Sequence, residues 1–463
     1  MAWWNGRACG GCQDSLRPQA GIPLRLRLGK ADALIISLPD LKASDDRFHG
    51  LRRVLALVGP GIFCVGYTIG TGAVTKLTAA GAQGGMQLLW VAPLGCILFW
   101  TLMEAYGRYT VVTGETALHG FRTQLRGGYS LALVVLAGVA ISQWTGLPVL
   151  VSLVSQLIYD GLRLLIPSAP AQHQGAVIGI AVIMLSGVYA LLWVGRHSLL
   201  EKALMVLVTV MAGGFGGAMG LAQPAPEMFA RGLIPSLPTV DDGTLLIMAL
   251  IGTSVAAPTF LMRSLLMKTK GWGGENVREQ RRDAGIATFV ILLIGVSVMA
   301  CAAGAFYHQG QSIRNIFDVV HNLTPAVGRF AAGLFLLGAV SAGLSSLIPM
   351  TMILPLLLAD FRRGKLQLNT PWFRGVAALA CVIGLAGPIF GDELLPIHRA
   401  SSEIARVLVL PLVVGGVFLL LNRDELMGRH KAGFWLNAGL VAAFGFSLIL
   451  SWSGLTALGR RLA

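Results

Sequence analysis

Gly59-Pro-Gly-Ile-Phe-Cys-Val-Gly-Tyr-Thr-Ile-Gly-Thr-Gly-Ala-Val-Thr-Lys-Leu-Thr-Ala-Ala-Gly81 is the stretch around which the rest of this chain is organised. It is apolar enough to lie in a bilayer, yet Gly66, Gly70 and Gly72 interrupt its middle. Glycine costs about 1 kcal/mol in a helix interior, so the cluster predicts a span that is broken into two half-helices. Lipid tolerates such a break only where the freed backbone faces protein or a water-filled cavity. In membrane transporters such breaks typically mark the substrate site.

The composition indicates an all-α polytopic membrane protein. The chain has 463 residues, of which 55% are hydrophobic and only 13% are charged, and its mean hydropathy is +0.70. Soluble domains carry about 25% charged residues. The net charge of +14 lies mostly in short loops between apolar stretches, where it is typical of the positive-inside rule. We therefore expect the lipid bilayer as the partner and no nucleic acid; the oligomeric state stays open.

Eleven transmembrane spans are predicted from windows of about 20 apolar residues, the length that crosses the hydrocarbon core. The first is the broken stretch quoted above. The predicted spans cover residues 52–82, 86–107, 130–159, 175–194, 200–222, 243–269, 285–307, 326–358, 373–391, 403–421 and 433–455.

Basic residues alternate between the loops in a way that predicts the orientation. With the N-terminus in the cytoplasm, the cytoplasmic loops hold most Lys and Arg. We therefore predict a multi-pass protein of the plasma (inner) membrane with a cytoplasmic N-terminus. The cytoplasmic set is Arg122, Arg126, Arg196, Lys202, Lys268, Lys270, Arg278, Arg281, Arg282, Arg362, Arg363, Lys365, Arg423, Arg429 and Lys431, against Arg163, Arg231, Arg314 and Arg399 outside.

Residues 1–48 form a separate region, which we predict to be either a disordered cytoplasmic segment or an upstream start that the mature protein does not use, preceding a transporter domain over 49–463. Cys9 and Cys12 have the spacing of metal ligands, but no second Cys/His pair lies nearby and a structural zinc site needs four ligands. We expect neither a metal site there nor a cofactor. The four cysteines inside the spans are expected to be small buried hydrophobes.

The sixth span repeats the peculiarity of the first. Gly252, Thr253 and Ser254 lie in its middle, and Pro258 follows. Proline removes a backbone donor and clashes with the preceding turn, so a break near Ala256–Pro258 is predicted. Broken spans five apart fit two inverted five-span repeats plus one extra span, which places both breaks at the same depth.

Two motifs resemble the Nramp family. The run from Gly59-Pro-Gly61 to Gly81-Ala-Gln-Gly-Gly-Met-Gln-Leu-Leu-Trp90 is similar to the family's first span and loop, and Gly107-Arg-Tyr-Thr-Val-Val-Thr-Gly-Glu115 is similar to the end of its second span. The resemblance implies the leucine-transporter-like fold of five plus five inverted spans. It also implies proton-coupled import of Mn²⁺, Fe²⁺ and related divalent metals.

The positions that bind metal in the family differ in this chain. Gly70-Thr-Gly-Ala73 replaces the Asp-Pro-Gly-Asn of the first break, and Ala256-Ala-Pro258 replaces the Met-Pro-His of the sixth. Ser142-Gln-Trp-Thr145 lies where the family places an acidic residue in the third span. No metal ligand set is therefore expected.

Neutral groups remain at the two breaks. Backbone carbonyls and hydroxyls can hold a still-hydrated cation, a small neutral solute or an anion, whereas a bare dication lacks the carboxylate that would offset its lost hydration. The predicted substrate-binding residues are Gly70, Thr71, Gly72, Ala73, Thr253, Ser254, Val255, Ala256 and Thr259.

Three charged residues fall inside or beside the spans. Lys76 follows the first break, and Glu104 is the acid predicted to lie well inside a span. Because intramembrane charges usually pair, Lys76 and Glu104 are candidate coupling or gating charges, or simply a structural ion pair. Arg263 is expected to reach lipid phosphate by snorkelling.

The sequence predicts a secondary transporter of the Nramp-like class rather than an enzyme, because no catalytic constellation or phosphate-binding loop is apparent. The leading hypothesis is divalent metal transport by alternating access at the two breaks. One alternative keeps the fold and changes the substrate to a small neutral or anionic solute. Another is a membrane receptor or scaffold that transports nothing.

Overall fold

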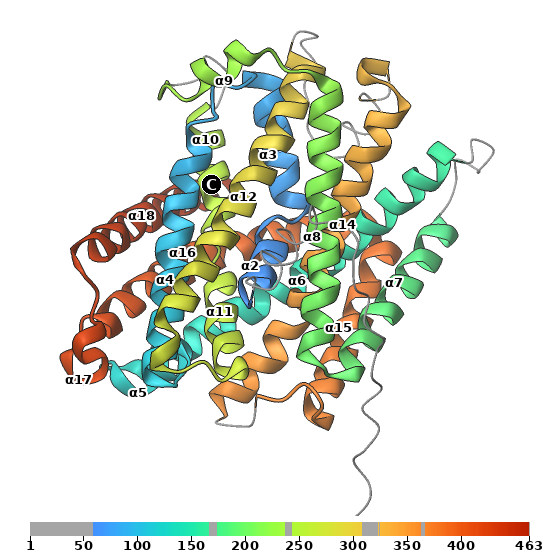
Figure 1. Cartoon of the computed structure of the whole chain (residues 1–463). Helices are drawn as coiled ribbons and strands as arrows, with labels where there is room; N and C mark the ends of the chain where they lie inside the picture. Colours follow the sequence, from blue (N-terminus) through green and yellow to red (C-terminus); the bar gives the residue numbers. More distant parts are fainter. Residues whose placement is uncertain are drawn as a thin grey trace, which may run out of the picture. The chain divides into compact units, whose positions relative to one another are not determined.

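The structure is a computed structural model, and it describes residues 59–165, 174–236, 243–307, 323, 325–362 and 366–462. Helices make up nearly all of these residues (Figure 1). In these ranges nine helices are long and apolar enough to cross a membrane. The pair α2 (Gly61–Thr68) and α3 (Thr71–Gly84), together with α4 (Val91–Thr113), completes the eleven predicted spans. The predicted N-terminal segment lies outside the described residues.

The nine long apolar helices follow the predicted spans, one of them again as a broken pair. They are α6 (Gly128–Leu165), α7 (Gln174–Val194), α8 (His197–Ala222), α10 (Gly243–Ser254) with α11 (Ala257–Lys270), α12 (Val277–Phe306), α14 (Arg329–Phe361), α15 (Pro371–Phe390), α16 (Leu395–Leu421) and α18 (Phe434–Leu462). Short helices α5 (Ala117–Gln124), α9 (Pro226–Gly232) and α17 (Asp424–Met427) lie between them, with 3₁₀ turns at Gly274–Asn276, Gly391–Leu394 and Gly428–His430.

Local sequence explains where several helices begin and end. The Thr116 hydroxyl accepts a hydrogen bond from the backbone N–H of His119 and so caps α5. Thr370 caps α15 in the same way, with Pro371 as the first helical residue. Threonine is a preferred N-cap because its hydroxyl satisfies a backbone N–H that has no partner inside the helix. Proline is preferred as the first helical residue because it has no N–H that needs such a partner. Helix α4 ends at Thr113 and is capped by Gly114, whose φ of 69° is left-handed, a conformation that costs glycine little.

Two helices begin well before the predicted boundary. Helix α12 starts at Val277 rather than at residue 285, and α16 starts at Leu395 rather than at 403. In both cases the extension carries charged or polar residues that hydropathy assigns to a loop. In α12 the extension includes the buried Asp283, which pairs with Arg263 of α11.

The broken helix α2–α3 lies at the centre of the fold. Helix α2 contacts α8, α11, α12 and α14, and each of its residues except Tyr67 is buried. Its neighbour α14 has 72% of its apolar window buried inside the protein, whereas peripheral α7 has only 28%. The first break is therefore surrounded by protein, as a membrane requires of irregular backbone.

Candidate functional site

The first break falls at Ile69 and Gly70. Helix α2 ends at Thr68, Gly70 is extended (φ −90°, ψ 177°), and α3 starts at Thr71; Figure 1 shows α3 continuing beyond α2. The carbonyl of Gly66 accepts hydrogen bonds from two hydroxyls of α14, Ser346 Oγ at 2.6 Å and Ser345 Oγ at 3.3 Å. A carbonyl near the end of the half-helix is thus satisfied by protein rather than left facing lipid.

Glycine is needed at this break for close packing and not for a left-handed conformation. A Cβ on Gly70 would lie 2.8 Å from Ser346 Oγ, and one on Gly66 would lie 3.0 Å from the carbonyl oxygen of Ser345. Gly72, in contrast, has no atom within 4 Å of such a Cβ. The first two glycines therefore let α14 approach the broken span.

The second break falls at Val255 and Ala256, which confirms the predicted interruption. Helix α10 ends at Ser254 and α11 begins at Ala257. Pro258 is near the N-terminus of α11, where its missing N–H has no partner to lose. The proline therefore starts the second half-helix rather than bending a continuous one.

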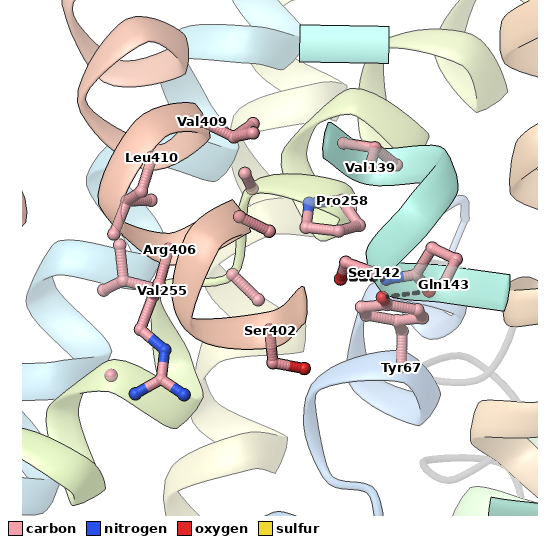
Figure 2. Close-up of a pocket in the computed structure, with 14 residues that line it drawn as sticks. Tyr67, Val139, Ser142, Gln143, Val255, Pro258, Ser402, Arg406, Val409 and Leu410 are labelled. Atoms are coloured by element: carbon pink, nitrogen blue, oxygen red, sulfur yellow. Dashed lines mark hydrogen bonds between the residues drawn. The ribbon is translucent and has the colours of Figure 1, made fainter. Parts of the chain in front are cut away.

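A cavity of about 150 Å³ lies where the two broken spans meet α6 and α16 (Figure 2). On one side Tyr67 donates its phenolic hydrogen to Gln143 Oε1 at 2.6 Å. On the other side Arg406 projects from α16 and pairs with Glu403 at 3.1 Å. The lining residues are Tyr67, Val139, Ser142, Gln143, Gly252, Val255, Ala256, Ala257, Pro258, Ser402, Ala405, Arg406, Val409 and Leu410.

The polar side chains of this cavity carry three neutral hydroxyls, one neutral amide and one guanidinium: they are Tyr67, Ser142, Ser402, Gln143 and Arg406. Neither a carboxylate nor a sulfur-containing side chain lines it, and the described ranges contain no group of three His, Cys, Asp or Glu residues that could hold a metal. The volume is enough for about five water molecules at ~30 Å³ each. The cavity can therefore hold a small polar solute, or an ion that keeps part of its water shell.

Four of the nine predicted substrate-binding residues line one of two cavities. Val255 and Ala256 line the larger one, whereas Thr253 and Ser254 line a smaller cavity of about 30 Å³. The remaining five belong to neither of these two cavities: they are Gly70, Thr71, Gly72, Ala73 and Thr259. Of these, Thr71 and Ala73 are buried beside the first break, and Thr259 is buried in α11.

Sequence reasoning missed Ser402 and Arg406. The predicted span began at residue 403, which placed these residues at its edge, whereas α16 begins at Leu395 and carries them inside. An arginine within a span is itself a signal of function, and Arg406 lies inside the predicted span 403–421 as well as inside α16. Tyr67 and Gln143 stood inside quoted stretches but carried no distinguishing chemistry of their own.

The predicted Lys76–Glu104 ion pair is wrong. Glu104 pairs with Arg108, one turn away in α4, at 2.6 Å, and it accepts a hydrogen bond from Gln280 Nε2 at 2.7 Å. The charged groups whose fields act on Lys76 are Arg406 and Glu403 of α16. Lys76 therefore interacts electrostatically with charged residues of α16 near the cavity. Glu104 instead forms a separate polar cluster with Arg108 and Gln280.

The expectation that Arg263 reaches the lipid surface is also wrong. Its side chain is fully buried and forms an ion pair with Asp283 of α12. Its Nη2 also donates to the carbonyl of Gln280 at 2.9 Å. The early start of α12 supplies the acidic partner that the predicted span excluded.

In the part of the chain that the structure describes, eleven spans, with the first and sixth interrupted around one polar cavity, define a membrane transporter of the leucine-transporter-like fold. A family model described as "Natural resistance-associated macrophage protein-like" matches residues 61–457. The chain belongs to the Nramp family.

Known relatives agree with this assignment over most of the chain. A "Divalent metal cation transporter MntH" of Vibrio campbellii is 26% identical over 416 residues, which cover 87% of this chain and 92% of that protein. The protein of the same description from Verminephrobacter eiseniae is 25% identical and covers 89% and 92%. A crystal structure of an Eremococcus coleocola manganese transporter superposes with a TM-score of 0.72 at 17% identity, covering 90% of this chain and 88% of that one.

Proposed function

We propose that this protein carries divalent metal cations across the plasma (inner) membrane by alternating access, with its N-terminus in the cytoplasm. The observation that carries the proposal is the cavity of about 150 Å³ bounded by Tyr67 at the end of α2 and by Val255 to Pro258 at the second break. Half-helices can tilt about such breaks and open the cavity to either side in turn. The names of the two MntH relatives support divalent metals as the substrate.

The lining residues indicate how a dication is held in this cavity. Oxygens of Ser142, Gln143 and Ser402 are hard, neutral ligands, which suit a cation that retains waters. Because no carboxylate lines the cavity, stripping the ion completely would leave its charge largely uncompensated. We infer that the metal enters with part of its hydration shell and binds more weakly than at an acidic site.

The charged residues around the cavity have a modulating role in this proposal. The carboxylate of Glu403 offsets the guanidinium of Arg406, and Lys76 of α3 lies within electrostatic range of both residues. In this proposal the hinges are the breaks at Ile69–Gly70 and Val255–Ala256. The other predicted residues flank them: Thr71, Gly72 and Ala73 in α3, Thr253 and Ser254 in α10, and Thr259 in α11. The protein then acts as a transporter and not as an enzyme, and its partners are the bilayer and the transported ion.

Uptake by purified protein in proteoliposomes tests the proposal. We expect Mn²⁺, Fe²⁺ or Mg²⁺ to enter faster than into empty liposomes. Two neighbouring residues of α6 provide a matched pair: Ser142 lines the cavity, whereas Ile141 is 56% exposed on the outer surface. Ser142→Phe should reduce uptake at least about tenfold, and Ile141→Phe should leave it unchanged. Failure of all three metals to exceed empty liposomes would overturn the assignment of the substrate.

A further inference from the structure

Two large apolar cavities follow one face of α14, where this helix meets α6, α7 and α8. Their volumes are about 710 Å³ and 660 Å³, and both are lined by Ile158 of α6. On α14 the lining residues include Arg329, Gly333, Leu337, Val340, Leu344 and Ile348. Their spacing of three or four residues places them on one face of the helix, and at about 1.5 Å per residue this face is about 28 Å long. We call the two cavities together the α14 groove.

The α14 groove opens toward lipid because the surrounding helices leave a gap. Helix α7 packs on α6 and α15, whereas α8 packs on α12 and α14, and α7 and α8 scarcely contact each other; Figure 1 shows α7 at the edge of the helix bundle. Ile183 of α7 and Val206 of α8 line the groove and are 75% and 61% exposed. Every lining residue except Arg329 is apolar. The groove can therefore hold a hydrocarbon chain, and it offers a polar solute no partner along its length.

One end of the groove is positively charged. Arg329 begins α14, and its Nη2 donates a hydrogen bond to the carbonyl of Leu164 at 2.6 Å, at the end of α6. Because two spans end here, Arg329 lies at the level where lipid headgroups meet the hydrocarbon core. Arg163 lies in the last turn of α6 and Asp160 lies just before it, so this end carries two positive charges and one negative charge.

Arg329 is suited to bind a phosphate. The side chain is exposed, and the hydrogen bond to Leu164 uses only one of the five N–H donors of a guanidinium. The other donors can form charge-assisted hydrogen bonds with phosphate oxygens. The N-terminus of α14 lies beside them, has no side-chain cap and also favours a negative charge.

We propose that the α14 groove binds one anionic phospholipid, with its phosphate at Arg329 and one acyl chain in the groove. A positive charge at one end of a long apolar groove matches an amphiphile rather than a free anion, since each buried CH₂ group of the chain adds to binding. This site goes beyond the proposed transport function and does not depend on which ion is carried.

The bound lipid supports the helix that holds the first break. Leu344 lines the groove, and the next two residues of α14, Ser345 and Ser346, donate hydrogen bonds to the carbonyl of Gly66. A chain packed against Leu344 and Ile348 therefore covers the lipid-facing side of α14 at the depth where another side of the same helix holds α2. We expect bound lipid to raise the stability of the folded protein.

Native mass spectrometry of the purified full-length protein tests the site. The delipidated protein is titrated with dioleoyl phosphatidylglycerol, which is anionic, and with dioleoyl phosphatidylcholine, which has the same chains and no net charge. We expect one tightly bound phosphatidylglycerol and an affinity for phosphatidylcholine that is lower by about fivefold, the scale of one basic residue at a lipid surface. Inorganic phosphate should not bind measurably, because it lacks the chains.

Two pairs of variants separate the headgroup from the chain. Arg329→Gln should abolish the preference for phosphatidylglycerol, whereas Arg399→Gln should keep it, since Arg399 is also exposed and lines neither cavity of the groove. Gly333→Leu should block both lipids, because a Cβ at Gly333 meets no atom within 4 Å and a longer side chain fills the groove. Its control is Gly179→Leu, at an equally unobstructed glycine of α7 that lines neither cavity.

The unfolding temperature in detergent shows whether each variant is folded and gives a second readout, since a ligand that binds the folded state stabilises it. Phosphatidylglycerol should raise this temperature less in Arg329→Gln than in Arg399→Gln. If Gly333→Leu does not fold, Gly187→Leu replaces it, because Gly187 lines the other cavity with the same free space.

Three results would overturn the proposal. Equal binding of both lipids by the unsubstituted protein, or equal lipid binding by the Gly333 and Gly179 variants, would mean that only unspecific annular lipid covers the groove. Inorganic phosphate that binds as tightly as phosphatidylglycerol would identify a free anion as the ligand. Dissociation of a dimer by Gly333→Leu without loss of lipid would identify the groove as a contact between two copies of this chain.

Discussion

The guanidinium of Arg263 in α11 lies against the carboxylate of Asp283 in α12, and both side chains are fully buried. The same carboxylate accepts hydrogen bonds from the backbone N–H of Gly59 at 2.7 Å and of Gly61 at 3.0 Å. These two N–H groups belong to the start of α2, where the helix dipole favours a negative charge. One carboxylate therefore anchors the first half-helix of the broken span, α2, to α11 and α12.

Breaking this ion pair should destabilise the protein strongly. Asp283→Asn leaves the Arg263 guanidinium buried without a counter-charge, which typically costs about 3–5 kcal/mol. It also weakens the anchor of α2, so the half-helix should detach more easily. Thermal unfolding of the purified variant in detergent measures the first effect, and proteolysis near residue 59 in the folded state measures the second.

An exposed ion pair provides the control for that experiment. Glu227 and Arg231 of α9 are paired at 3.7 Å and are 82% and 84% exposed. Water screens such pairs to below about 1 kcal/mol, so Glu227→Gln should leave the unfolding temperature nearly unchanged. A similar fall in unfolding temperature for Asp283→Asn and Glu227→Gln would show that burial does not decide how strongly the Arg263–Asp283 pair stabilises the protein.

Replacing either of two glycines in the first span by alanine should change the stability of the protein, in opposite directions at the two positions. At Gly81 a Cβ would lie 2.3 Å from the backbone oxygen of Met299, whereas at Gly72 it meets nothing within 4 Å. Overpacking against a backbone atom typically costs about 1–3 kcal/mol, and Gly→Ala at an unstrained helix position gains about 0.4–1 kcal/mol. Unfolding temperatures should therefore fall for Gly81→Ala and rise slightly for Gly72→Ala. The same sign for both would contradict the role of close packing between α3 and α12.

The glycines and Pro258 show how much of the fold the sequence predicts. Periods of apolar residues and the positions of glycine and proline are local properties, and they located both broken spans. Asp283 and Arg406 show where prediction stops. Asp283 lies in a helical extension that hydropathy assigns to a loop, because its buried partner Arg263 is brought to it only by the folded chain. Arg406 lies inside its predicted span, but the sequence does not reveal that it lines a cavity and pairs with Glu403 there.

The site is less predictable than the fold for a related reason. The spacing of Thr253 and Ser254 places them near the second break, but it does not reveal on which side of the break they lie. In the structure they face the small cavity, whereas Val255 and Ala256 face the larger one. The unwound backbone turns successive residues to different sides, and sequence periodicity does not describe such a turn.

Neutralising Arg406 should improve the binding of a divalent cation in the larger cavity. Its guanidinium lines that cavity and repels a dication, while its loss also frees the carboxylate of Glu403. Both changes make the electrostatic potential in the cavity more favourable to a cation. Arg406→Gln should therefore lower the KM of metal uptake by up to about tenfold, equivalent to about 1.4 kcal/mol.

The matched control is Arg399→Gln, since Arg399 is exposed on the same helix and lines neither cavity. Uptake into proteoliposomes at several metal concentrations gives KM for both variants. An unchanged or higher KM for Arg406→Gln would show that the transported ion does not approach this arginine.

The positive-inside pattern predicts which loops face the cytoplasm, and single cysteines test it. Arg429 belongs to the predicted cytoplasmic set and Arg231 to the outer set, and both are exposed. In the described chain the native cysteines Cys64, Cys96, Cys301 and Cys381 are buried, so they add little background. In whole cells a membrane-impermeant maleimide should label Arg231→Cys above the level of the unsubstituted protein, whereas Arg429→Cys should require permeabilised cells. The reverse pattern would place the N-terminus outside.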